Sequence, residues 1–98
     1  MSIRELQQKV SPLCKELGVK SLHLFGSRAR NADLAGRDYD FVVDFPNLEP
    51  KEYADKYFKL LHGLEDTLLE RIDLLTRESL TKDSLIKNIE KDSVSLYE

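Results

Sequence analysis

Aspartates recur at alternating positions in one short segment of the chain, and they are the first sign of chemistry. Residues 38–45 are predicted to form a strand, because apolar and polar side chains alternate along most of it. Asp38, Asp40 and Asp44 fall on one face, although Asp is depleted in strands. Side chains two apart on a strand are separated by about 6.7 Å. Carboxylates at that spacing repel one another, and a divalent cation between them would remove the repulsion.

The donor type indicates which cation this would be. Hard oxygen ligands with no His or Cys pair nearby suit Mg²⁺ or Mn²⁺ better than zinc. The alternative is a half-buried strand with a solvated acidic face, which is the commoner interpretation of an arbitrary D-x-D. Asp44 lies toward the end of the strand and is expected to be solvated rather than metal-bound.

The segment before these aspartates favours the metal interpretation. A predicted strand runs into Gly26-Ser27 and a helix start, which directs backbone N–H groups at an anion above the turn. Gly26 allows close backbone approach, and the Ser27 hydroxyl can donate to a phosphate oxygen. Residues 27–37 carry a charge of +2 and the next twelve carry −4. A metal–triphosphate needs such donors and carboxylates side by side, although Gly-Ser alone is more often an ordinary turn.

A third carboxylate lies in another predicted strand. Asp73 is in the middle of residues 71–75, which are otherwise apolar at their centre. If this strand neighbours 38–45, Asp73 would complete the metal site or take a proton from an attacking hydroxyl. The alternative is a solvent-facing Asp on an edge strand.

Together these residues resemble a known family. Gly26-Ser27, ten intervening residues and Asp38-Tyr39-Asp40 are similar to the G-S-x10-D-x-D signature of the minimal nucleotidyltransferases, in the DNA polymerase beta-like nucleotidyltransferase superfamily. Segments 24–30, 38–43 and 71–75 and the ending 89–97 look typical of it, so the resemblance covers nearly the whole chain. It implies a nucleotidyltransferase fold and the transfer of the α-phosphate of a nucleoside triphosphate, usually ATP, to an acceptor hydroxyl, with pyrophosphate leaving.

The resemblance also implies roles for individual residues. Asp38 and Asp40 would bind two Mg²⁺ ions, and Asp73 would be the third carboxylate, nearest the acceptor oxygen. Two metals about 3.5–4 Å apart would stabilise the attacking and leaving oxygens together.

The phosphate contacts implied by the resemblance come from the turn. Gly26 and Ser27 would hold the β- and γ-phosphates, and Arg28 and Arg30 are further candidates for phosphate contacts. Arg37 departs from the family, where Ser or Thr is common before the first Asp. Arg37 could crowd the site, add a phosphate contact or point away.

Composition limits the class of protein. The chain has 98 residues, 41% of them hydrophobic, which is enough for a single domain over 1–98 but not for two. Its longest apolar runs are too short for a membrane span or signal peptide. The net charge of −3 argues against a general nucleic-acid coat. One cysteine forms no internal disulfide and fits a reduced, cytoplasmic protein.

The hydrophobic pattern predicts helices alternating with strands, an α/β (α+β) domain in which helices pack on a small mixed sheet. The expected elements are helix 3–17, strand 19–25, helical turns 28–32, strand 38–45, helix 50–68, strand 71–75, helix 85–89 and strand 94–97.

The first helix has recognisable ends. Ser2 is its expected N-cap with Glu5 as capping-box partner, and Gly18 is its expected C-terminal cap. Pro12 lies inside the pattern and removes one backbone hydrogen bond, so the helix could kink or break there. Cys14 lies on the apolar stripe and is predicted to be core rather than a reactive thiol.

Other eye-catching residues have plainer interpretations. His23 and His62 have no partner at metal-ligand spacing and are expected to be structural or surface groups. Tyr53 and Tyr57 lie one turn apart and favour core or interface packing over base stacking. Residues 82–91 are expected to be the solvated face of the last helix.

The leading hypothesis is an ATP-dependent transferase that adenylylates another macromolecule. We expect 98 residues to leave no room for a domain that holds the acceptor, so a partner would bring it. By family resemblance the partner is a HEPN-type ribonuclease toxin, modified on a tyrosine hydroxyl, and association with itself or this partner is expected. Two alternatives stay open: a binding module that neutralises its partner by complex formation, and a transferase acting on a small molecule or an RNA end.

Overall fold

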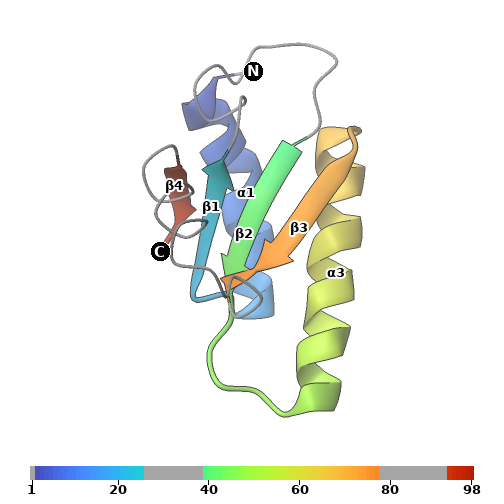
Figure 1. Ribbon diagram of the computed structural model, residues 1–98. Coiled ribbons are helices and arrows are strands. Elements are labelled where there is room, and N and C mark those ends of the chain that lie inside the picture. Colours follow the sequence, from blue (N-terminus) through green and yellow to red (C-terminus); the bar gives the residue numbers. More distant parts are fainter. Residues whose placement is uncertain (1, 26–38, 78–92) are drawn as a thin grey trace.

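The computed structural model describes residues 2–25, 39–77 and 93–98, and this part forms two helices packed on a four-stranded sheet (Figure 1). The two-layer arrangement confirms the predicted fold class. The elements are α1 Ile3–Leu17, β1 Ser21–Phe25, β2 Tyr39–Asp44, α3 Pro50–Leu68, β3 Ile72–Thr76 and β4 Val94–Tyr97. The expected helices at 28–32 and 85–89 lie outside the described residues.

The sheet has the strand order β3-β2-β1-β4 and is mixed, as predicted. β1 pairs antiparallel with β2 and with β4, whereas β2 and β3 run parallel. A parallel pair needs a crossover of a dozen residues or more, and α3 supplies it between β2 and β3. The first residues of β2 and β3 therefore lie at the same end of the sheet as the last residues of β1 (Figure 1).

The N-terminal end of α1 is capped as the sequence predicted. The Ser2 side-chain oxygen accepts a hydrogen bond from the Glu5 backbone N–H at 3.2 Å, which satisfies one of the unpaired donors of the first turn. The helix continues through Pro12 to Leu17, so this proline does not break it.

The C-terminal end of α1 accounts for a shift in the first strand. Gly18 adopts a left-handed conformation with φ 69°, and its N–H donates to Lys15 O while the Val19 N–H donates to Cys14 O. These two bonds form a Schellman motif. Val19 therefore belongs to the helix cap, and β1 begins at Ser21 rather than at the predicted residue 19.

The other predicted strands shift by one residue or less at the ends that the structure describes. β2 is described from Tyr39 and ends at Asp44, one residue before the predicted end. β3 runs from Ile72 to Thr76. The Tyr39 N–H donates to the Arg71 carbonyl, and this bond makes Ile72 the first partner of β2 in the parallel ladder. The closing strand coincides with the predicted 94–97.

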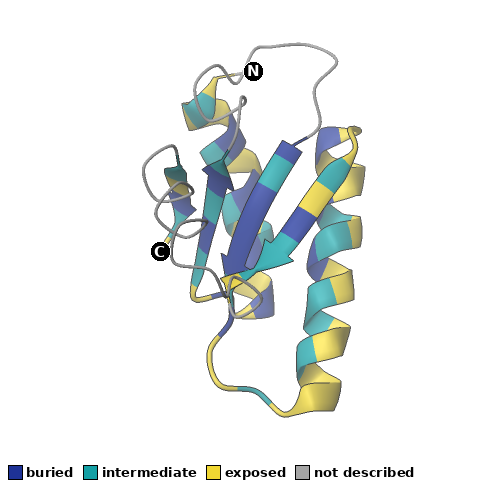
Figure 2. Cartoon of the chain, in the orientation of Figure 1, coloured by how far each residue is buried: buried dark blue, intermediate teal, exposed yellow. Residues whose placement is uncertain are grey.

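The main core lies between the sheet and the two helices, and β2 contributes more to it than the other strands (Figure 2). Fully buried side chains come from both helices and both central strands; they are Leu6, Val10, Cys14, Leu22, Leu24, Phe41, Val43, Leu60 and Leu64. Gly63 allows α1 and α3 to approach closely, because a Cβ atom there would lie 2.7 Å from Leu13 Cδ2.

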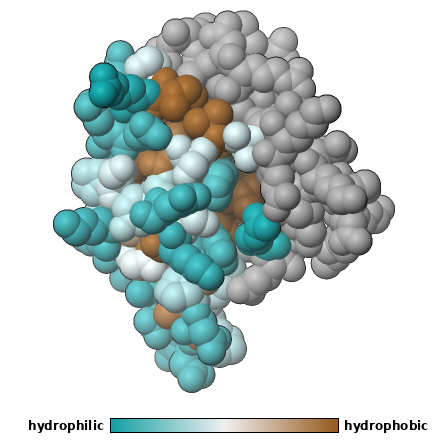
Figure 3. All heavy atoms as spheres, turned by 90° about the vertical axis from the view of Figure 1, so that its left-hand side faces the viewer, coloured by the Kyte–Doolittle hydropathy of each residue, from teal (hydrophilic) through white to brown (hydrophobic). Residues whose placement is uncertain are grey.

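Outside the core the described chain is largely polar. Seen from the side of β4, its surface is mostly hydrophilic, with hydrophobic groups gathered toward the upper part and centre of the view (Figure 3). Neither α1 nor α3, the helices among the described residues, is long and apolar enough to cross a membrane.

Two residues that end helices provide an opposed pair of stability tests. Gly18 and Leu69 both have positive φ values, 69° and 53°, and Leu69 is 86% exposed. Left-handed backbone costs a residue with a Cβ about 1–2 kcal/mol. We expect Gly18→Ala to lower the free energy of unfolding by about 1 kcal/mol and Leu69→Gly to raise it by about 0.5 kcal/mol, once the greater freedom of the unfolded glycine is subtracted. Urea denaturation would measure both, and changes of the same sign would contradict this assignment.

The buried thiol gives a chemical test of the core. Cys14 is fully buried, and burial raises the pKa of its thiol to about 12. Since the thiolate is the reactive form, we expect iodoacetamide at pH 8 to alkylate the native chain about a thousandfold more slowly than the denatured chain. Mass spectrometry of timed samples would measure the rates, with guanidinium-treated protein as the reference. Equal rates would place Cys14 outside the core.

Candidate active site

Two of the predicted site carboxylates are brought directly opposite one another. In the parallel ladder between β2 and β3, Asp40 and Asp73 are Cα partners. Adjacent strands lie about 4.8 Å apart, which is closer than the spacing of alternate residues along one strand. The sequence predicted that Asp73 would matter if its strand neighboured the aspartate-rich one, and β3 does lie next to β2.

The burial pattern shows which face carries these two side chains. Their neighbours Phe41 and Leu74, also Cα partners, are buried in the main core. Because alternate residues of a strand point to opposite faces, Asp40 and Asp73 project from the face away from the helices. Asp40 is half-buried and Asp73 is exposed. Asp73 is therefore a solvent-facing Asp on an edge strand, as the alternative interpretation expected. That interpretation did not include a second carboxylate, Asp40, directly opposite it.

Apolar side chains border the pair on the same face. Val42 is 3% exposed and packs with Phe25 and Leu75 in a second, smaller cluster. Val42 pairs with Leu75, and Phe25 pairs with Asp40. The two carboxylates are therefore placed at the border of an apolar patch, where electrostatic interactions are stronger than in open water. Two in-register carboxylates are a fitting partial ligand set for a hard cation such as Mg²⁺.

The remaining predicted site residues lie outside the described residues; they are Gly26, Ser27, Arg28, Arg30 and Asp38, together with Arg37. The chain nevertheless enters and leaves their segment beside the pair. Phe25, the last residue of β1, is the Cα partner of Asp40, and Tyr39 follows position 38 directly. Within the described residues, no group of three or more His, Cys, Asp or Glu side chains is arranged to hold a metal ion.

Three residues expected to have structural or surface roles make ordinary contacts with their neighbours. Asp44 lies 4.0 Å from Lys20 Nζ, four residues along the strand from Asp40. His23 lies 3.5 Å from a carboxylate oxygen of Glu98, and His62 lies against the Phe58 ring with centroids 6.3 Å apart.

Both tyrosines pack as expected. The Tyr53 ring meets Phe45 edge to face, with centroids 5.2 Å apart. Tyr57 also packs against the main core.

Tyr57 has a second role that the sequence did not indicate. Its hydroxyl donates a hydrogen bond of 2.6 Å to the Leu74 carbonyl, next to Asp73 in the chain. Burial raises the pKa of Tyr57, and the negative charge of Asp73 raises it further. The phenol therefore keeps its proton and remains a donor. Only the helical spacing that put Tyr57 on the inner face of α3 could have pointed to it.

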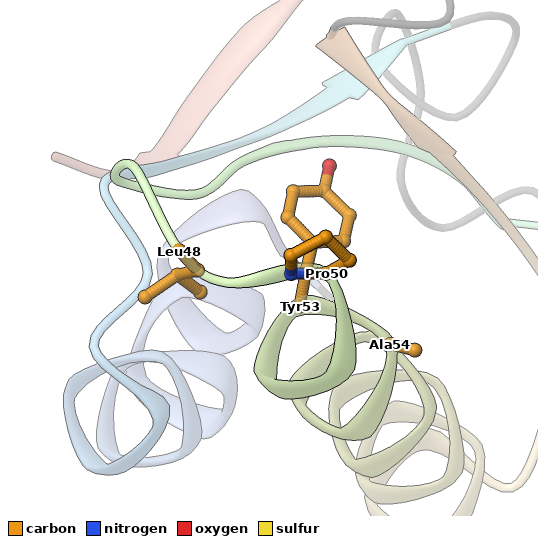
Figure 4. A pocket seen from close by; sticks show the side chains of 4 residues that line it. All are labelled: Leu48, Pro50, Tyr53 and Ala54. Atoms are coloured by element: carbon orange, nitrogen blue, oxygen red, sulfur yellow. The ribbon is translucent and has the colours of Figure 1, made fainter.

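The hollow formed by Leu48, Pro50, Tyr53 and Ala54 is separate from the carboxylate pair (Figure 4). It has a volume of about 340 Å³ and lies at the start of α3. This is the opposite end of the sheet from the first residues of β2 and β3 (Figure 1). Its lining brings together three aliphatic side chains and one tyrosine, without a charged group, so it does not resemble a phosphate or metal site.

Comparison with known sequences identifies the family. The sequence model of the nucleotidyltransferase domain matches residues 4–96, nearly the whole chain. The chain belongs to the nucleotidyltransferase family. The paired carboxylates of β2 and β3 are thus part of a nucleotidyltransferase enzyme.

Relatives with assigned names agree with this family. A protein of Methanocaldococcus jannaschii named "putative protein adenylyltransferase" is 36% identical over 89 residues, which is 88% of this chain and 92% of the relative. A second protein of that organism with the same description is 32% identical over 93 residues, 94% of this chain and 92% of the relative.

Solved structures share the fold. A protein described as a "putative minimal nucleotidyltransferase" superposes with a TM-score of 0.77 at 24% identity, covering 96% of this chain and 95% of that one. A chain from a toxin-antitoxin complex with AMP-PNP superposes with a TM-score of 0.69 at 18% identity, covering 93% and 72%. A chain from the complex of a tri-AMPylated Shewanella oneidensis HEPN toxin with an MNT antitoxin gives 0.67 at 18% identity, covering 98% and 72%.

The carboxylate pair predicts opposite effects of one substitution with and without metal. Like charges opposite one another in a ladder destabilise it, so Asp73→Asn should raise the melting temperature slightly in EDTA. The same change should reduce or abolish the further rise that Mg²⁺ and an ATP analogue produce by binding the folded state. Differential scanning fluorimetry would measure both, with Asp44→Asn, on the same face of the sheet in the neighbouring strand β2, as the control. A full Mg²⁺-dependent rise in Asp73→Asn would exclude Asp73 as a ligand.

Proposed function

We propose that this nucleotidyltransferase transfers AMP from ATP to a tyrosine hydroxyl of a partner protein, a HEPN-type ribonuclease toxin, and thereby neutralises it. The observation that carries the proposal is the register of β2 with β3, which places Asp40 opposite Asp73 on the face away from the helices. Of the two, Asp73 is the more exposed, as expected of a group that must meet an acceptor on another macromolecule.

Each site residue has a definite task in this reaction. Asp38, Asp40 and Asp73 would hold two Mg²⁺ ions, which supply charge stabilisation to the attacking and leaving oxygens when bound. Asp73, nearest the acceptor, accepts the proton of the attacking hydroxyl. The hydroxyl oxygen forms a bond to the α-phosphorus as the bond to the bridging oxygen breaks, and pyrophosphate leaves.

The triphosphate is held by the glycine-containing turn. Gly26 and Ser27 would bind the β- and γ-phosphates, with Arg28 and Arg30 adding positive charge. This turn follows directly after Phe25, the Cα partner of Asp40. The chain therefore enters the proposed phosphate-binding segment at the end of the sheet where Asp40 lies, which suits a metal–triphosphate.

Several findings support a protein acceptor. The relatives from Methanocaldococcus jannaschii are named as protein adenylyltransferases. The fold is shared with chains from toxin-antitoxin complexes, one with AMP-PNP and one with a tri-AMPylated HEPN toxin.

We also propose that residues 1–98 act as one domain in the cytoplasm, where a free thiol such as that of Cys14 stays reduced.

The test is transfer of label from [α-³²P]ATP to a HEPN-type ribonuclease, which the proposal expects to be encoded beside this gene. We expect Mg²⁺-dependent labelling of one or more tyrosines, identified by peptide mass spectrometry. The double variant Asp38→Asn, Asp40→Asn should lower the transfer rate by at least about a thousandfold, because the charge stabilisation by bound metal is lost. Asp44→Asn should transfer AMP at the rate of the natural chain.

Growth assays with the toxin separate catalysis from simple binding. Under the proposal the double variant fails to protect cells even though it still binds the toxin. Full protection by the double variant would show that neutralisation occurs by complex formation. Label appearing only on RNA ends or small molecules would exclude a protein acceptor.

A further inference from the structure

Asp73 lies in a strand at the edge of the sheet. β3 is at the edge of the strand order and pairs only with β2 among the described strands. It is five residues long. A slip of one residue would move Asp73 to the helix-facing side, because successive side chains of a strand alternate between faces. The distance between Asp40 and Asp73 therefore depends on what holds β3 in place.

One side chain from the helix layer contacts this strand beside Asp73. The Tyr57 hydroxyl donates a hydrogen bond of 2.6 Å to the Leu74 carbonyl. The Leu74 side chain is 4% exposed and lies in the main core. Residue 74, the next residue after Asp73, is thus held by its side chain and by its carbonyl, which belongs to the peptide unit between Leu74 and Leu75.

The helix that carries Tyr57 is anchored in the main core. Leu60 and Leu64, one and two turns further along α3, are fully buried. The Tyr57 ring packs on the same core and meets the Phe58 ring edge to face, with centroids 5.4 Å apart. Tyr57 therefore connects α3 to the edge strand β3 through one hydrogen bond.

The geometry points to Tyr57 as a positioning residue, whose hydroxyl holds β3 through Leu74 and keeps Asp73 opposite Asp40. The inference rests on the proposed function, since it assigns Tyr57 a part in forming the metal and nucleotide site. Tyr57 does not contact the reacting atoms. The raised pKa of its phenol, due first to burial and then to Asp73, keeps the hydroxyl protonated as the donor that this contact requires.

The test variant is Tyr57→Phe, which retains the ring and its packing and removes only the hydroxyl. Mn²⁺ serves as the metal probe, titrated calorimetrically into the full chain in the presence of a non-hydrolysable ATP analogue. We expect the Kd for Mn²⁺ to rise about tenfold, the lower end of the loss seen when outer-shell partners of ligands are removed. The Mg²⁺ concentration for half-maximal AMP transfer should rise by a similar factor, and saturating Mg²⁺ should restore most of the rate.

Two controls separate positioning from general effects. Tyr53→Phe removes a hydroxyl from the same helix one turn earlier, on the side that meets Phe45. Gly18→Ala destabilises the chain at the end of α1, far along the sequence from both strands of the pair. Both variants should bind Mn²⁺ with the Kd of the natural chain.

A measurement without metal keeps the inference independent of catalysis. In Tyr57→Phe, backbone amides of residues 72–76 should exchange with deuterium at least about tenfold faster, while those of 21–25 stay unchanged. Unchanged exchange in 72–76, or an unchanged Kd for Mn²⁺, would overturn the positioning role. If the natural chain itself bound no Mn²⁺ with the analogue and transferred no AMP, the proposed function would fall and the role of Tyr57 with it.

Discussion

The parallel pairing of β2 with β3 is the constraint on which the site depends. Its register places Asp40 opposite Asp73, and the neighbouring pair Phe41 and Leu74 is buried in the core on the other face. A shift of one residue would expose Leu74 and bury Asp73, which the hydrophobic effect and the desolvation of a carboxylate both oppose. The same alternation that stabilises the fold therefore determines where the two carboxylates meet.

This pairing requires α3, because parallel neighbours cannot be joined by a tight turn. Pro50 occupies the first helical turn, where its missing N–H removes no hydrogen bond. The helix ends at Leu69 in left-handed backbone, an unfavourable conformation for a leucine that is also exposed. Three residues later the chain enters β3. The turn thus retains a local strain within the connection that delivers Asp73 to the sheet.

The proposed cation would lie beside two like charges, Asp40 and Asp73, and would reduce their repulsion. Two carboxylates in register disfavour the pairing of their strands, and natural chains retain such unfavourable contacts chiefly at functional sites. The apolar neighbours Val42 and Leu75 strengthen whatever charge interaction occurs there. Under the proposed function, one face of the sheet carries the chemistry while the other carries the core.

Much of the fold and of the candidate site could be predicted from the sequence, because the sequence patterns that indicate them are local. The alternation in 38–45, the cap at Ser2, the helical spacing of Cys14 and the proline at the start of the long helix each reflect a few neighbouring residues. The predicted strand ends were less accurate. The Val19 N–H, for example, donates to the Cys14 carbonyl in the cap of α1, so Val19 is not part of the strand.

The sequence by itself determined the residue types and the spacing of the candidate site, including its three carboxylates and the Gly26-Ser27 pair, because these are properties of the chain read in order. Only the tertiary structure decided that Asp73 lies opposite Asp40 and that the Tyr57 hydroxyl of α3 reaches the Leu74 carbonyl of β3. Strand order and register depend on how distant segments share one core. Hydrogen bonds such as that from Tyr57 to Leu74 join residues 17 positions apart, and local sequence patterns carry no signal for them.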